Sequence, residues 1–247
     1  MFVKSKDGVR IYYELIRNDK KSFLVFLHGL ASSSKSFKNQ IDYLKKYYSI
    51  IAIDFRGHGQ SDKPKGSEYY TIQHSINDIK SVLSKENVKS YSVIGFSLGG
   101  GVALRLAQKD NRVNHIIVIN PAFGRESVRP SFLLKLFAAK FVPRFLIKLF
   151  TTSEDESKFY GLLDVYGKHL LHTPRYVYET IIKTDESADS IKLKKKFTII
   201  KSDNDEILNY YVPKNLNYDL MTISGHHYVL PENPKELNSA ILYALGK

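Results

Sequence analysis

Short apolar runs alternate along this chain with longer stretches in which apolar residues recur at helical spacing. The runs are typical of strands buried on both faces, and the longer stretches of amphipathic helices. A hairpin that turns at Asp7-Gly8 is predicted before them. This alternation predicts an α/β fold, in which helices cover both faces of a mostly parallel central sheet. The predicted strands are residues 23–27, 50–54, 91–94, 113–119, 197–201 and 220–223, and the predicted helices are residues 36–47, 71–86, 98–110 and 234–245.

Residues 122–195 break the alternation, because they contain helix-like stretches and no clear strand. Within them, residues 132–150 are apolar nearly all round, and Pro143 should kink a helix there. Basic residues interrupt the stretch too often for a transmembrane helix. It could form a cap over an active site, or an interfacial helix that contacts lipid. We favour the cap, with residues 1–121 and 196–247 forming the core and residues 122–195 a helical cap insertion.

The segment Gly95-Phe96-Ser97-Leu98-Gly99 lies between a predicted strand and a predicted helix. A serine on such a tight turn has its hydroxyl pushed clear of the sheet, and the flanking glycines let the turn pack closely. The helix N-terminus behind it stabilises a developing negative charge. Ser97 is therefore the predicted nucleophile of an acyl-transfer reaction.

A nucleophilic serine needs a base and an acid that orients the base. Asp203 and Asp205 follow one later strand, and His226 and His227 follow the last strand. Both places are carboxyl ends of strands, where open α/β sheets gather their sites. The order along the chain is therefore serine, aspartate, histidine, and both pairs of candidates remain open on these grounds.

Several motifs together make the chain resemble α/β-hydrolase-fold serine hydrolases of the capped esterase and lipase type. The resemblance implies Ser97 as nucleophile, Asp205 as orienting acid and His226 as base, because Gly225-His226 fits the Gly-His pair of the family. Two departures stand out: Ser202 occupies a position at which the family pattern has glycine, and the trailing Glu and Pro fit His227 better than His226. The motifs are Leu27-His28-Gly29-Leu30, Asp54-Phe55-Arg56-Gly57-His58-Gly59-Gln60-Ser61-Asp62, Gly95-Phe96-Ser97-Leu98-Gly99-Gly100, Asp205 and Gly225-His226.

The oxyanion hole is expected to use two backbone N–H groups, those of Leu30 and Leu98. Phe96 and Phe123, near the turn, are expected to contact substrate. His28, Arg56 and His58 are interpreted as structural residues that hold their loops together, which agrees with the resemblance.

The expected function is that of a carboxylesterase that cleaves esters of short-to-medium acyl chains through an acyl-enzyme intermediate. Carbon–carbon bond hydrolases, cofactor-free haloperoxidases and lipases with the same triad remain alternatives, as does a non-catalytic receptor on the same fold. Dehalogenases and epoxide hydrolases of this fold use aspartate as nucleophile, so Ser97 argues against both.

Composition and charge limit the kinds of site and binding partner that the chain can have. The 247 residues include no cysteine, which excludes disulfides, a thiolate nucleophile and cysteine-based metal sites. The net charge of +12 is interpreted as solvated surface lysine, because no basic run is interleaved with aromatic residues as in nucleic-acid sites. We expect no metal or cofactor, a small-molecule ester as the binding partner, no nucleic acid, and at most weak peripheral membrane contact. The N-terminus has no apolar signal core, so a cytoplasmic location is expected.

Overall fold

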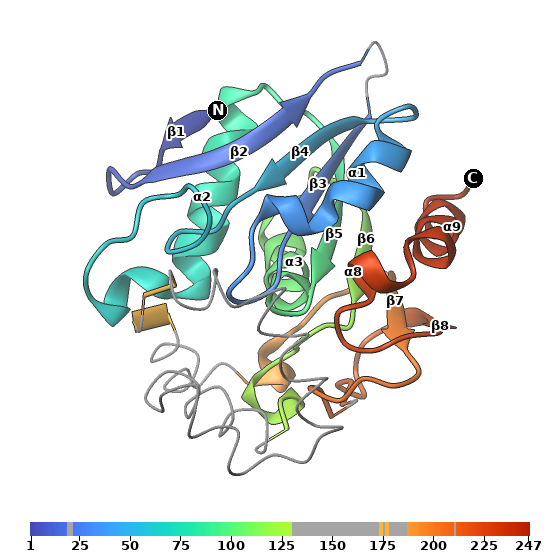
Figure 1. Cartoon of the computed structure of the whole chain (residues 1–247). Helices are drawn as coiled ribbons and strands as arrows, with labels where there is room; N and C mark the ends of the chain where they lie inside the picture. The colour runs from blue at the N-terminus through green and yellow to red at the C-terminus, as the bar shows by residue number, and fades with distance from the viewer. Residues whose placement is uncertain (19–21, 130–172, 175, 178–186, 210) are drawn as a thin grey trace, which may run out of the picture.

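The computed structural model of the chain describes residues 1–18, 22–129, 173–174, 176–177, 187–209 and 211–247 (Figure 1). Most of the predicted cap insertion, including its apolar residues 132–150, lies outside these described residues. The domain boundaries therefore stay a prediction.

The described residues form one eight-stranded sheet with the order β1-β2-β4-β3-β5-β6-β7-β8 (Figure 1). The predicted hairpin is present as two antiparallel strands, and its second strand pairs antiparallel with β4. All further pairings, from β4 to β8, are parallel. The strands are β1 Phe2–Lys4, β2 Arg10–Ile16, β3 Phe23–Leu27, β4 Ser49–Ile53, β5 Tyr91–Phe96, β6 Val113–Ile119, β7 Phe197–Ser202 and β8 Tyr218–Ile223.

Helices cover both faces of this sheet. On one face lie α2 (Ile72–Lys85) and α3 (Leu98–Lys109), and on the other lie α1 (Lys38–Leu44), α8 (Val229–Glu232) and α9 (Pro234–Ala244) (Figure 1). The short 3-10 helices are η1 (Ser34–Phe37), η2 (Ser67–Tyr70), η3 (Arg125–Ser127) and η4 (Ala188–Ser190).

The central strands direct apolar side chains to both faces of the sheet because each face has its own core. In β4, Ile51 and Ile53 pack into the core beneath α2 and α3, whereas Ile50 and Ala52 pack into the core beneath α1 and α9. Successive side chains of a strand point to opposite faces, so a strand covered on both sides cannot alternate apolar with polar residues. The predicted α/β architecture is confirmed.

The two ends of the predicted insertion meet beside α3. The guanidinium of Arg105 donates from Nη1 to the carbonyl of Phe123 (3.0 Å) and from Nη2 to the carbonyl of Ser187 (3.1 Å). Glu126 accepts hydrogen bonds from the N–H of Ala188 (2.5 Å) and from the Ser187 hydroxyl (3.0 Å). Described residues near both ends of the predicted insertion are therefore tied to each other and to the helix that follows Ser97.

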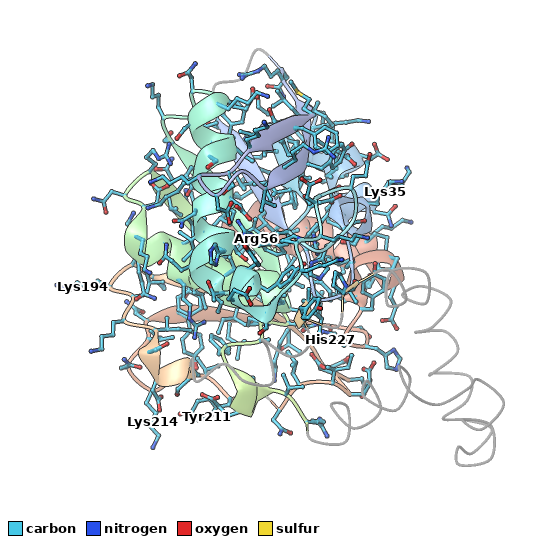
Figure 2. All side chains as sticks on the ribbon, turned by 90° about the vertical axis from the view of Figure 1, so that its left-hand side faces the viewer. Lys35, Arg56, Lys194, Tyr211, Lys214 and His227 are labelled. Atoms are coloured by element: carbon cyan, nitrogen blue, oxygen red, sulfur yellow. The ribbon has the colours of Figure 1, made fainter. Side chains whose placement is uncertain are left out.

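A buried ion pair fixes the loop after β4. Arg56 makes two hydrogen bonds of 2.7 Å to Asp78 in α2, and a third of 2.8 Å to Asp7 in the hairpin turn. Its side chain lies inside the molecule, whereas Lys35 and Lys194 protrude at the rim (Figure 2). These contacts agree with the structural role expected for Arg56.

Candidate active site

Ser97 is the single residue between β5 and α3. Its backbone has φ +52° and ψ −116°, a conformation that residues other than glycine rarely adopt. Its N–H donates to the carbonyl of Ile119 (2.9 Å), and its own carbonyl accepts from the N–H groups of Gly100 (2.9 Å) and Ala122 (3.0 Å). These bonds hold the strained turn, which is the predicted elbow.

Two glycines allow the elbow to pack. A Cβ atom on Gly95 would lie 2.3 Å from the carbonyl oxygen of Gly99, and a Cβ on Gly99 would lie 2.1 Å from that of Leu27. Both distances are far inside van der Waals contact. Any side chain there would force α3 away from β5 or β3, and the glycine spacing of the motif follows from this close approach.

His227 lies between Ser97 and Asp205. Its Nε2 is 3.1 Å from the Ser97 hydroxyl oxygen, and its Nδ1 is 2.8 Å from Oδ2 of Asp205. With the Nδ1 proton donated to the carboxylate, Nε2 is free to accept the hydroxyl proton of Ser97. The His227 side chain is only 4% exposed, so bulk water does not compete for these contacts.

Asp205 is held in its ionised form. Burial, the largest single influence, would by itself raise the pKa of its carboxyl group. The hydrogen bond from His227, the electrostatic attraction of that residue and two backbone hydrogen bonds together outweigh it. The N–H groups of Ile207 and Leu208 also donate to Oδ1, each at 2.9 Å. The pKa of Asp205 is therefore lowered, and its negative charge is available to orient His227 at neutral pH.

The prediction of His226 as the base is wrong in this geometry. Its Nδ1 is 2.6 Å from Oε1 of Glu232, and its side chain is 48% exposed. The chain turns at Gly225, where φ is +138°, so that the second histidine faces Ser97. The spacing of the trailing Glu and Pro was the sequence signal that favoured His227.

Asp203 does not join the site. One of its carboxylate oxygens accepts the N–H of Gly225 at 3.0 Å, which makes it a cap of the turn before the histidines. The choice of Asp205 over Asp203 therefore agrees with the geometry.

The two backbone N–H groups expected to form an oxyanion hole lie beside Ser97. Leu98 begins α3, and the loop that carries Leu30 passes so close that a Cβ on Gly29 would lie 3.3 Å from Cβ of Ser97. Neither N–H donates to an acceptor among the residues that the structure describes. Both donors are thus available, and the oxyanion role stays a prediction.

His28 fixes the direction of one of these donors. Its Nε2 accepts the N–H of Phe55 (3.0 Å), which leaves the proton on Nδ1, and Nδ1 lies 2.6 Å from the carbonyl oxygen of Gly29. A trans peptide points its N–H opposite its carbonyl. By holding the Gly29 carbonyl, the buried His28 therefore holds the N–H of Leu30.

The two phenylalanines expected to contact substrate are both buried. The ring of Phe96 packs against that of His227, with centroids 5.2 Å apart, and against Tyr228. Phe123 packs into the core on the α3 side of the sheet. Contact of either ring with a substrate stays a prediction.

Two residues near His227 were missed by sequence reasoning. The carboxylate of Glu206 accepts the backbone N–H of His227 (3.1 Å), and the amide of Asn120 donates to its backbone carbonyl (2.8 Å). Neither residue belongs to a motif. In the sequence, Asn120 is marked only by its place between the predicted strand 113–119 and Pro121.

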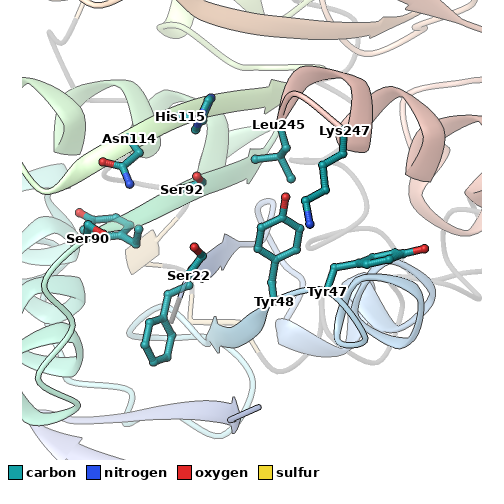
Figure 3. Close-up of a pocket in the computed structure, with 11 residues that line it drawn as sticks. Ser22, Tyr47, Tyr48, Ser90, Ser92, Asn114, His115, Leu245 and Lys247 are labelled. Carbon is teal, nitrogen blue, oxygen red and sulfur yellow. The ribbon is translucent and has the colours of Figure 1, made fainter. Parts of the chain in front are cut away.

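A cavity of about 360 Å³ lies at the opposite edge of the sheet, around Tyr47, Tyr48, Ser92 and Lys247 (Figure 3). Ser92 is near the start of β5, whereas Ser97 follows its end. Ser97 lies five positions after Ser92, which along a strand is about 16 Å. The cavity is therefore not part of the candidate active site.

Among the residues that the structure describes, no group of three or more His, Cys, Asp or Glu side chains could hold a metal ion. No helix in the same part of the chain is long and apolar enough to cross a membrane.

Comparison with known proteins identifies the family. A family model described as alpha/beta hydrolase fold matches residues 23–164, more than half of the chain. The chain belongs to this family. The esterase from Exiguobacterium antarcticum superposes with a TM-score of 0.80 at 20% identity, over 100% of this chain and 99% of the other. At that identity the likeness shows the fold alone.

Curated relatives share only part of their length with this chain. Epoxide hydrolase 4 of Mus musculus is 30% identical over 164 residues, which are 62% of this chain and 45% of that protein. The uncharacterized hydrolase YugF of Bacillus subtilis is 35% identical over 114 residues, 46% of this chain and 41% of that protein. The matched region thus spans less than half the length of these relatives.

Proposed function

We propose that this alpha/beta hydrolase cleaves carboxylic esters, with Ser97 as nucleophile, His227 as base and Asp205 as the acid that orients it. One observation carries the proposal: His227 bridges the Ser97 hydroxyl, at 3.1 Å, and the ionised Asp205, at 2.8 Å. Both distances lie within the range for proton transfer and orientation by a general base.

The proposed reaction has two steps, acylation of Ser97 and hydrolysis of the acyl-enzyme. Ser97 Oγ attacks the carbonyl carbon while His227 Nε2 takes its proton, and the N–H groups of Leu30 and Leu98 stabilise the oxyanion. His227 then passes that proton to the departing alcohol, which leaves an acyl-enzyme ester on Ser97. A water molecule repeats the sequence, releases the carboxylic acid and restores the serine.

Epoxide opening is disfavoured, although a curated relative has the name epoxide hydrolase. Attack of a serine oxygen on an epoxide carbon would form an ether, which has no carbonyl for water to attack. A carboxylate nucleophile would form an ester, which water can cleave. Because Ser97 stands at the elbow, the chemistry favours substrates with an acyl carbon.

The proposed substrates are esters of short-to-medium acyl chains. The support is the apolar character of residues 132–150 within the predicted cap insertion, which suits the walls of an acyl pocket.

A chain-length series of p-nitrophenyl esters tests the proposal, with styrene oxide assayed in parallel. We expect turnover of the shorter esters by the wild-type protein, no turnover by Ser97→Ala, and no hydrolysis of the epoxide by either. Epoxide hydrolysis without ester turnover would contradict the proposed function.

A further inference from the structure

The side chain of Asn120 joins the ends of two strands to the loop that carries His227. Its Oδ1 accepts the backbone N–H of Ser202, at 2.7 Å. Its Nδ2 donates to the Ser202 hydroxyl and to the backbone carbonyl of His227, each at 2.8 Å. Asn120 is only 2% exposed, so these three bonds take the place of bonds to water.

The backbone of Asn120 is as constrained as its side chain. It has φ +40°, in the left-handed region that asparagine tolerates better than most residues. Its N–H donates to the carbonyl of Ile200 in β7, and the preceding carbonyl, of Ile119, accepts the N–H of Ser97; both distances are 2.9 Å. One short segment at the end of β6 therefore supports the nucleophile through its backbone and the histidine through a side chain.

We propose that Asn120 is a positioning residue for His227, an inference that rests on the proposed function. Asp205 holds the far side of the imidazole through Nδ1, which fixes the ring about one atom only. The backbone of His227 is held at its carbonyl by Asn120 and at its N–H by Glu206. Asn120 thereby keeps Nε2 within reach of Ser97 Oγ while the proton moves from serine to leaving group.

Ser202 completes the arrangement. Here the Ser202 hydroxyl accepts one N–H of the Asn120 amide, and the other N–H is directed to His227. The amide orientation is therefore set by Ser202, which accepts from Nδ2 and donates its own N–H to Oδ1.

Asn120→Asp is the sharpest test, because aspartate has the same shape and also tolerates the left-handed backbone. It keeps an acceptor for the Ser202 N–H but loses both donors, and it places a carboxylate oxygen against the His227 carbonyl. We expect kcat for p-nitrophenyl esters to fall about 10- to 100-fold, the loss typical of a small misplacement of a reacting group. KM should stay within about twofold, because the Asn120 side chain is buried and its hydrogen bonds go to Ser202 and His227. If the aspartate variant does not fold, Asn120→Gly replaces it, because glycine adopts a positive φ without strain. It should likewise lower kcat and leave KM nearly unchanged.

Asn18→Asp is the matched control. The amide of Asn18 also donates to two backbone carbonyls, those of Lys45 (2.9 Å) and Tyr48 (2.8 Å), but it lies at the far edge of the sheet from Ser97. We expect this variant to lower the melting temperature and to leave kcat unchanged.

A second readout does not depend on activity. The Nδ1 proton of His227, bonded to the Asp205 carboxylate, should give a downfield proton resonance that is assigned by its loss in His227→Gln. We expect Asn120→Asp to shift or remove this resonance and Asn18→Asp to leave it in place. An Asn120→Asp protein with wild-type kcat and an unchanged resonance would overturn the proposal, even if its melting temperature fell.

If the wild-type protein neither turns over esters nor reacts at Ser97 with a fluorophosphonate, the proposed function fails. The resonance alone then decides the role of Asn120: a shift supports it, and an unchanged signal overturns it.

Discussion

Two adjacent histidines, His226 and His227, occupy different environments, and this difference decides which one can act on Ser97. The first pairs with Glu232 at the surface, and the second is enclosed between Ser97, Asp205 and the ring of Phe96. Proton transfer requires contact, so the enclosed residue is the one suited to act as base.

Alanine at these two positions should give opposite results. We expect His227→Ala to lower kcat for p-nitrophenyl esters by about 10⁴-fold or more, as loss of a triad member does. His226→Ala should keep kcat within a few-fold, because this side chain contacts Glu232 rather than Ser97. Steady-state kinetics of both purified variants measure this. A large loss of kcat in His226→Ala, together with near wild-type kcat in His227→Ala, would contradict the assignment of His227 as the base.

Asp205 gives a prediction about pH. The pKa of its carboxyl group is lowered in the folded protein from the ordinary value of 3.8, so the unfolded chain binds the proton more readily. Its ionised form therefore adds stability that is present above about pH 4 to 5 and is lost as pH falls through the folded pKa. Urea unfolding of the wild type and of Asp205→Asn, from pH 7 down to pH 3, measures this effect. We expect the free energy of unfolding of the wild type to fall relative to that of Asp205→Asn only at the acid end of the range. A difference that stays constant over this range would contradict the lowered pKa.

At the scale of elements, Arg105 binds α3 to both ends of the predicted cap insertion. Arg105→Ala would leave the buried carbonyl of Phe123 without this donor. We expect the free energy of unfolding to fall by about 2 to 3 kcal/mol, the cost of charged hydrogen bonds lost at a buried place. Arg10→Ala is the control, because its ion pair with Asp62 is exposed and solvent screens such pairs. Equal effects of the two substitutions, measured by urea unfolding, would show that Arg105 does not hold these segments.

The elements themselves could be predicted from the sequence because burial on both faces gives the central strands runs of consecutive apolar residues, such as residues 23–27 and 50–53. Boundaries shifted by a few residues: the helix expected from residue 36 begins as the 3-10 turn η1, and β8 starts at Tyr218 rather than at residue 220. The elbow was predictable because Gly95 and Gly99 are demanded by backbone contacts that any side chain would break.

The choice of histidine and the role of Asn120 could not be predicted in the same way. His226 fitted the Gly-His pair, but the path of the loop after Gly225 depends on bonds made by Glu206 and Glu232, which lie in other segments. The hydrogen bonds of Asn120 join residues 82 and 107 positions away along the chain. No local pattern records such contacts.

At the scale of the whole molecule, the net charge of +12 is carried in part by lysines that protrude at separate places, such as Lys35, Lys194 and Lys214 (Figure 2). Charges dispersed in this way are screened beyond about 10 Å at 0.1 M salt. We expect weak co-sedimentation with phosphatidylserine vesicles at low salt and none at physiological salt. Binding that persists at high salt would contradict the interpretation of the charge as solvated surface lysine.

The central claim is that His227, held by Asp205, activates Ser97. Labelling with a fluorophosphonate, followed by peptide mass spectrometry, tests it most directly, because the probe reacts only with an activated serine. We predict a single modified residue, Ser97, with the label retained in His226→Ala and lost in His227→Ala. A label on another residue, or full labelling of Ser97 in His227→Ala, would contradict the account.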